Sequence, residues 1–186
     1  MEKQKIERII LGIDPGTNIM GAGVLEINNK KLNCQKIEII KLNKLENHAL
    51  KLKQIFEKTL NLIDLYKPDE IAFEAPFYGK NVQSMLKLGR AQGVAMAAGL
   101  FRNIPIFEYS PKKIKQSITG NGNASKEQVA GMLKNILNIK IPKYLDGTDG
   151  LAVALCHYYQ NNNNNKEKLS YKNWNNFIKN NEDKII

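Results

Sequence analysis

The chain has 186 residues, of which 42% are hydrophobic, and it carries a formal net charge of +10. This length favours one domain with its own core, and two isolated cysteines exclude a disulfide-rich secreted scaffold. No run approaches the roughly 20 apolar residues of a membrane-spanning helix, and no secretory leader is recognisable, so we expect a cytoplasmic protein without membrane contact.

The positive charge belongs mainly to the body of the chain. The segment 161–186 holds five lysines and three acids, so +8 of the excess precedes it. A basic domain favours a polyanionic partner such as nucleic acid. A compositional bias toward Lys, Asn and Ile explains the charge equally well, so the charge only supports such a partner.

The first half of the sequence predicts three strands, a helix and a fourth strand. The apolar run 9–14 predicts a strand covered on both faces, and the segments 20–27 and 32–42 predict two more. Short connections between these three favour antiparallel pairing. Apolar residues at helical spacing predict a helix over 48–66, and the run 69–74 then predicts a parallel strand after a right-handed crossover.

The second half predicts four helices and one more short strand. The helices are expected over 84–101, 112–119, 125–137 and 147–160. The strand is expected over 105–109, and Ser125 and Gln128 form a predicted capping box for the third of these helices. The first is rich in Gly and Ala, which permits close packing against the protein's own sheet or against a second helix.

These elements predict an α/β fold with a five-stranded mixed sheet, three strands antiparallel and then two parallel, flanked by helices. We expect this domain to occupy residues 1–160. The Asn- and Lys-rich residues 161–186 form a predicted C-terminal tail, because its five consecutive asparagines have no means of burying apolar surface.

Four acidic residues stand where predicted elements end or begin. Asp14 and Glu74 end the first and fourth strands, and Asp146 and Asp149 lie three residues apart at the start of the last helix. Parallel neighbouring strands bring their carboxyl ends to one edge of a sheet. Acids that converge there require a cation, and oxygen ligands suit Mg²⁺. We expect two Mg²⁺ ions, with Mn²⁺ as a substitute, to orient a water for phosphodiester hydrolysis.

Each acid taken alone has a simpler explanation. Asp14 precedes a Pro-Gly pair that favours a turn, and Glu74 suits a solvated strand end. Asp146 and Asp149 suit the positive end of a helix dipole. These explanations account poorly for the order of the acids and the elements around them, so we favour a shared metal site.

At these residues the sequence resembles the RuvC family of Holliday-junction resolvases. The similarity runs in order from about Ile9 to His157, and it is carried by IILGIDPGT (9–17), IAFE (71–74), LKLGRAQG (86–93) and DGTDGLA (146–152). The resemblance implies an RNase H-like fold and a Mg²⁺-dependent endonuclease that makes symmetric nicks in four-way junction DNA during recombination and repair. It also implies a homodimer formed through the Gly- and Ala-rich helix, and it leaves a RuvA–RuvB branch-migration partner open.

The resemblance further implies roles for individual residues. The residues that match the family's acidic catalytic and metal-binding positions are Asp14, Glu74, Asp146 and Asp149. Lys115 and Lys126 match lysines that the family needs for cleavage. Phe77 matches an aromatic that stacks on a base of the junction, and Lys80 and Arg90 are further candidates for substrate binding. His48 and His157 are not candidates for metal ligands.

Three other functions remain open on the sequence. The turn after Asp14 also resembles the phosphate-binding turn of actin-like ATPases and sugar kinases, although no second such turn or second lobe is recognisable. Another RNase H-like nuclease, acting on structured RNA or other DNA, is a closer alternative. A non-catalytic DNA-binding module is disfavoured, because a cluster of acids weakens the affinity of a surface for DNA.

Overall fold

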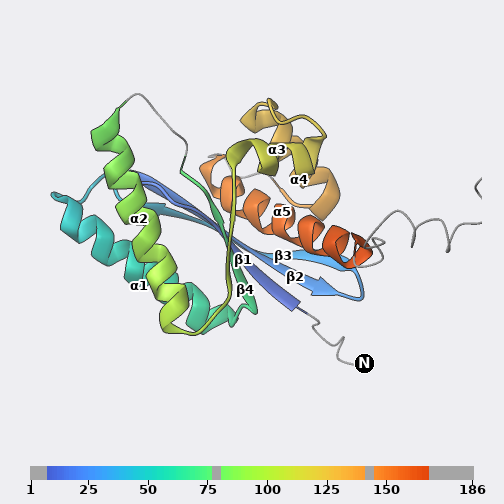
Figure 1. The fold of residues 1–186 in the computed structure, drawn as a ribbon, viewed down its shortest axis with the longest axis horizontal. Helices are drawn as coiled ribbons and strands as arrows, with labels where there is room; N and C mark the ends of the chain where they lie inside the picture. Colours follow the sequence, from blue (N-terminus) through green and yellow to red (C-terminus); the bar gives the residue numbers. More distant parts are fainter. Residues whose placement is uncertain (1–7, 77–80, 141–144, 168–186) are drawn as a thin grey trace, which may run out of the picture.

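The computed structural model describes residues 8–76, 81–140 and 145–167, and within them a five-stranded sheet of order β3-β2-β1-β4-β5 (Figure 1). The strands are β1 (Arg8–Asp14), β2 (Ile19–Asn28), β3 (Lys31–Lys41), β4 (Glu70–Glu74) and β5 (Ile106–Tyr109). β2 pairs antiparallel with both β1 and β3, whereas β4 pairs parallel with β1 and β5. The predicted mixed sheet is therefore confirmed.

Helices cover both faces of this sheet. They are α1 (His48–Tyr66), α2 (Val82–Phe101), α3 (Pro111–Thr119), α4 (Lys126–Leu137) and α5 (Asp146–Glu167). In Figure 1, α1 and α2 lie on one side of the sheet and α3, α4 and α5 on the other. The predicted capping box at the start of α4 is present, with Ser125 as the N-cap and Gln128 as its partner.

The end predicted for the last helix was wrong. α5 continues through the asparagine run to Glu167, seven residues beyond the expected end at Gln160. Asparagine is a poor helix former, but adding a residue to an existing helix costs far less than nucleating one. The buried turns from Gly150 to His157 supply that nucleus. Every other boundary lies within two residues of its prediction.

Alternating side chains of the strands build a core on each face of the sheet. Ile10 and Leu25 pack in the cluster that includes residues of α3, α4 and α5. Ile13 and Phe73 pack in the cluster that includes residues of α1 and α2. This two-sided burial explains why β1 is a continuous apolar run. Within the described part of the chain, no helix is both long and apolar enough to span a membrane.

Glycines allow α5 to lie directly on β1 and β2. A Cβ atom on Gly12 would fall 2.1 Å from the carbonyl oxygen of Gly150, and one on Gly21 would fall 2.2 Å from that of Asp146. Only a residue without a side chain permits so close an approach of backbones. The first turn of α5, with Asp146 and Asp149, is thereby held against the end of β1.

Candidate active site

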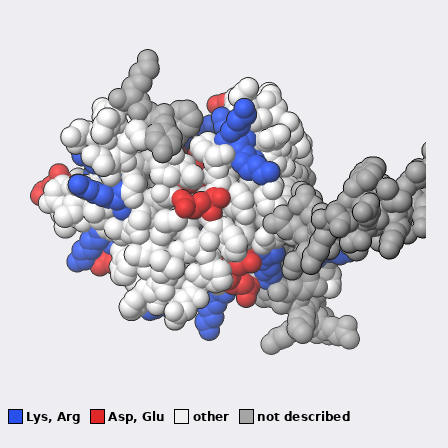
Figure 2. Space-filling model, viewed as in Figure 1, with Lys and Arg blue, Asp and Glu red and all other residues white. Residues whose placement is uncertain are grey.

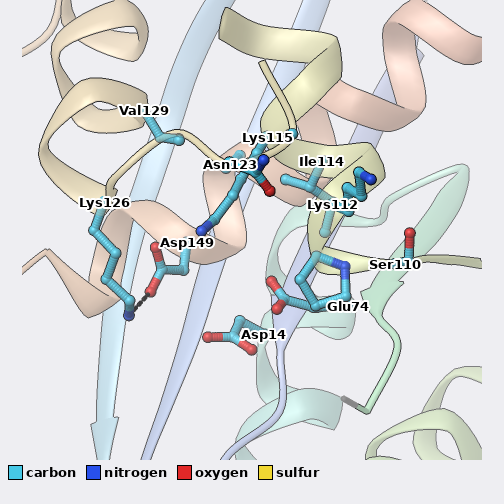
Figure 3. A pocket seen from close by; sticks show the side chains of 13 residues that line it. Asp14, Glu74, Ser110, Lys112, Ile114, Lys115, Asn123, Lys126, Val129 and Asp149 are labelled. Atoms are coloured by element: carbon cyan, nitrogen blue, oxygen red, sulfur yellow. Dashed lines mark hydrogen bonds and ion pairs between the residues drawn. The ribbon is translucent and has the colours of Figure 1, made fainter. Parts of the chain in front are cut away.

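Three of the predicted acids line one cleft at the carboxyl edge of the sheet. Ile13 of β1 is in register with Phe73 of the parallel strand β4, so Asp14 and Glu74 leave the sheet as neighbours. Asp149 reaches the same cleft from the first turn of α5 (Figure 3). The cleft has a volume of about 530 Å³. This placement follows the rule that sites in open α/β sheets form outside the carboxyl ends of strands.

Ionising the carboxyl groups of Asp14 and Glu74 in the cleft is unfavourable. Burial raises the pKa of Asp14 well above its usual value, and the carboxylates of Glu74 and Asp149 raise it further. Burial, followed by the charge of Asp149, raises the pKa of Glu74 to about 7. Like charges that are buried together disfavour ionisation unless a cation offsets them. The electrostatics of the cleft therefore favour a bound cation.

The chemistry of these donors fits a hard divalent ion. Carboxylate oxygens are the ligands that Mg²⁺ prefers, and Mg²⁺ usually keeps several waters besides one or two carboxylates. As the side chains stand, no group of three or more His, Cys, Asp or Glu among the described residues is arranged to hold a metal ion. The acids thus share a cleft and an electrostatic field without forming a complete set of ligands.

Lys126 at the start of α4 already pairs with two of the acids. Its Nζ lies 2.5 Å from Oδ2 of Asp149 and 3.4 Å from Oδ1 of Asp146. The side chain of Asp146 is 41% exposed and that of Asp149 is 15% exposed. Asp146 lines a smaller neighbouring hollow of about 260 Å³ and not the cleft, although its charge also raises the pKa of Asp14. The structure therefore places Asp146 at the rim of the site.

The second predicted lysine enters the cleft from α3. Ser110 caps this helix by accepting a hydrogen bond from the backbone N–H of Lys113, and Pro111 begins it. One turn later Lys115 lines the cleft, and Figure 3 shows its side chain directed toward the acids. The positive charges of Lys126 and Lys115 lower the pKa of Glu74, against the larger opposite effect of burial. Both predicted lysines thus lie within the electrostatic field of the acids.

Sequence reasoning overlooked three polar residues that line the cleft. They are Ser110, Lys112 and Asn123. Ser110 directly follows β5, which is parallel to β4, so the rule that located Glu74 also places Ser110 at this edge. Asn123 lies in the Gly-Asn-Gly-Asn segment between the two lysines. Its glycines indicate a flexible or tightly turned loop, and its contact with the cleft depends on the packing of α3 against α4.

The remaining candidates lie elsewhere. Arg90 is exposed on α2 and does not line the cleft, although its charge acts on His48. Phe77 and Lys80 lie outside the described residues. His157 is fully buried, with Nε2 2.9 Å from Oε2 of Glu70 and Nδ1 2.7 Å from the hydroxyl of Tyr109. These contacts hold α5 to β4 and β5, which explains the histidine without a role in metal binding.

Comparisons with known proteins point to one family. Residues 10–157 match the family model described as crossover junction endodeoxyribonuclease RuvC. A protein of that name from Christiangramia forsetii is 63% identical, covering 97% of this chain and 94% of the relative. One from Porphyromonas gingivalis is 54% identical, covering 96% and 97% respectively.

Solved structures agree with these sequence matches. T. thermophilus RuvC in complex with Holliday junction substrate has a TM-score of 0.77 and 29% identity, and the match covers 83% of this chain and 95% of that one. Another Thermus thermophilus RuvC structure has a TM-score of 0.74 and 30% identity, covering 84% and 96%. The family model over residues 10–157 and relatives that are 54% and 63% identical over nearly the whole chain show that this chain belongs to the RuvC family of crossover junction endodeoxyribonucleases.

Proposed function

We propose that this protein is a structure-selective DNA endonuclease that resolves Holliday junctions in DNA recombination and repair. Membership of the RuvC family is the observation that carries the proposal. The Thermus thermophilus relative bound to a Holliday junction supports four-way junction DNA as the substrate. The cleft of Asp14, Glu74 and Asp149 supports the hydrolytic chemistry.

Basic side chains beside the cleft support a DNA partner. Helix α3 carries Lys112, Lys113 and Lys115, and Figure 2 shows basic side chains gathered over this part of the surface. Lysines near phosphates release condensed counterions when DNA binds, so binding should weaken steeply with salt. In this proposal Phe77 stacks on an unpaired base near the cut, and Lys80 and Arg90 contact the backbone of the arms.

In the proposed mechanism the four acids Asp14, Glu74, Asp146 and Asp149 hold Mg²⁺, two ions per subunit, with Mn²⁺ as a substitute. Metal bound by these acids would supply Lewis-acid stabilisation of the charge that develops in phosphodiester hydrolysis. Asp14 and Glu74 line the same cleft because they end adjacent parallel strands. Lys115 and Lys126 offset the charge that develops on the scissile phosphate. Hydrolysis breaks the bond to the 3′-oxygen and leaves a 3′-hydroxyl and a 5′-phosphate.

The decisive experiment is cleavage of a synthetic four-way junction in the presence of Mg²⁺. We expect paired nicks at symmetric positions on opposed strands, with no cleavage of a linear duplex or an RNA–DNA hybrid, and no cleavage of any substrate in EDTA. Comparable cleavage of the hybrid would favour another RNase H-like nuclease. Tight junction binding without cleavage in either Mg²⁺ or Mn²⁺ would favour a binding module.

A homodimer through α2 is part of the proposal. On its outer face an added Cβ atom at Gly89 or Gly93 would meet no atom within 4 Å. The apolar side chains of Val82 and Leu86 are 66% and 52% exposed on the same helix. A bare apolar face with small residues suits close contact with a second copy across a two-fold axis. Such a dimer would present two clefts to two opposed strands of a junction.

Gly93→Gln is expected to weaken this dimer without harming the subunit. The new side chain enters open space in the monomer but fills the surface where the second copy is proposed to pack. We expect the dissociation constant of the dimer to rise about tenfold, which corresponds to a loss of about 1.4 kcal/mol of binding free energy. Sedimentation velocity over a concentration series measures it. Gly131→Gln on α4 is the matched control, since an added Cβ there also meets nothing within 4 Å. An unchanged dimer in the Gly93 variant would exclude this interface.

The remaining assignments are proposed on the same basis. Residues 1–160 form the nuclease domain and 161–186 a tail, with the first residues of the tail continuing α5 as far as Glu167. We propose a cytoplasmic location, because the chain resembles bacterial enzymes that act on DNA. A RuvA–RuvB complex is the proposed branch-migration partner, and co-purification with the two proteins on a junction would test it.

A further inference from the structure

A second polar hollow lies at the same edge of the sheet as the cleft, on the side that α1 and α2 cover. It has a volume of about 350 Å³ and shares no lining residue with the cleft. Its polar lining includes Thr17, Asn18, His48, Lys51, Ser84 and Lys87. Thr17 is only three residues beyond Asp14, in the connection from β1 to β2. The hollow and the cleft therefore flank one short turn.

The hollow carries more positive than negative charge. Burial and the cations Arg90, Lys87 and Lys51 lower the pKa of His48, which shows that these charges act on one point. Lys51 donates a hydrogen bond to Oδ1 of Asn18, 3.3 Å away, and no salt bridge joins these three cations to any acid among the described residues. Glu46 is the one acid in the described lining, and it is exposed.

Other basic residues of the protein show the contrast. Lys126 pairs with Asp149, Lys53 with Glu57 and Arg102 with Asp64. A group of cations that repel one another costs free energy unless an anion offsets the charge. The positive ends of α1 and α2 add to the same field, because both helices begin at this hollow.

A second observation indicates an absent hydrogen-bond partner. The Nε2 atom of His48 is buried and has no hydrogen-bond partner among the described residues. A buried polar atom without a partner is uncommon in folded proteins, and an ordered water beside the ring is one way to satisfy it. The caps of the two helices are already satisfied, since Asn47 accepts from Leu50 and Asn81 accepts from Ser84. The atom without a hydrogen-bond partner is therefore in the His48 side chain and not in the backbone of a helix end.

We propose that this hollow binds a phosphate of the junction DNA backbone, away from the phosphate that is cut. This inference rests on the proposed DNA-cleaving function. Lys51 and Lys87, which line the hollow from α1 and α2, supply the positive charge that a phosphate needs. No Phe, Tyr or Trp lies in the described lining, so the hollow suits the sugar–phosphate backbone and not a stacked base. Anchoring the strand on one side of the turn at Thr17 positions it over the acids on the other side.

The test compares two double variants with the same change of charge. Lys51→Gln with Lys87→Gln removes two cations of the hollow. Lys30→Gln with Lys31→Gln removes two exposed lysines at the β2–β3 turn, at the opposite end of the sheet. Binding to a labelled four-way junction is followed by fluorescence anisotropy at several salt concentrations in EDTA, which prevents hydrolysis. Thermal unfolding confirms that each variant is folded, and Lys87→Gln alone serves as a milder variant.

We expect the hollow variant to bind the junction about tenfold more weakly, and the slope of log K against log salt to fall in magnitude by about 1. The turn variant should match the unmodified protein in both quantities. Equal affinity and slope in the hollow variant, or an equal loss in the turn variant, would overturn the inference. Cleavage by the unmodified protein in Mg²⁺ is measured separately, so a failure of the proposed nuclease activity is distinguishable from a failure of this anchor.

Discussion

Asp14→Asn should lower the single-turnover rate of junction cleavage by about a thousandfold or more, while junction binding is retained. The substitution preserves the shape of the side chain but removes its charge from a cleft that needs negative oxygen ligands to hold a divalent ion. The charges of the other three predicted acids all raise the pKa of Asp14, so this carboxylate interacts with every acid of the proposed site. Binding should even tighten slightly, because one negative charge facing the DNA is lost.

The measurement pairs a cleavage assay in Mg²⁺ with a binding assay in EDTA on the same four-way junction. Asp64→Asn is the matched control, because Asp64 is an exposed acid that pairs with Arg102 on the far side of the sheet from α3–α5. This control should cleave like the unmodified protein. A cleavage rate for Asp14→Asn within a few-fold of the unmodified rate would remove Asp14 from the mechanism.

Glu74→Gln should stabilise the metal-free protein at pH 8 and abolish cleavage. The pKa of Glu74 is about 7 in the folded protein, against a usual value of 4.5. Because the folded pKa is raised, the contribution of this group to stability is fully present below about pH 4.5 and is lost as the pH rises through 7. At pH 8 the folded protein therefore carries a half-buried carboxylate at a cost of about 3 kcal/mol. Glutamine removes that cost together with one proposed metal ligand.

Urea unfolding in EDTA at pH 5 and pH 8 measures this effect. The free energy of unfolding of Glu74→Gln should depend less on pH than that of the unmodified protein, by about the stated amount. Added Mg²⁺ at pH 8 should stabilise the unmodified protein more than the variant, since a ligand that binds only the folded state raises its stability. Glu57→Gln, an exposed acid on α1, is the control and should leave the pH dependence unchanged. An identical pH dependence in Glu74→Gln would contradict the assigned pKa.

The fold was predictable because the relevant signals are local. The continuous apolar run of β1 and the short connections to β2 and β3 specify a buried meander. The helix at His48–Tyr66 between two such strands specifies the parallel placement of β4. Asparagine propensity misled the prediction of the end of α5, because a helix that packs well in its first turns extends through residues that would not start one.

The site was predictable only in part. The sequence predicted that Asp14 and Glu74 meet if the first and fourth strands are parallel neighbours, and the pairing of β1 with β4 fulfils that condition. The roles of Asp14 and Glu74 as metal ligands stay predictions. The roles of Lys115 and Lys126 in cleavage stay predictions too. Helical spacing put Asp146 and Asp149 on one face, and both do contact Lys126. Spacing does not reveal which of the two enters the cleft, because that depends on how α5 is rotated against the sheet.

By itself, the sequence determined the mixed sheet, the family and the edge at which two acids meet, since strand patterns and short motifs depend on neighbours along the chain. Only the tertiary structure decided the rest. It placed Asp149 in the cleft and Asp146 at the rim, brought Ser110 and Asn123 to the same wall, and gathered Lys51 and Lys87 beside His48. These contacts join residues from separate elements, and close packing of glycine backbones and helix faces sets them, which no local pattern encodes.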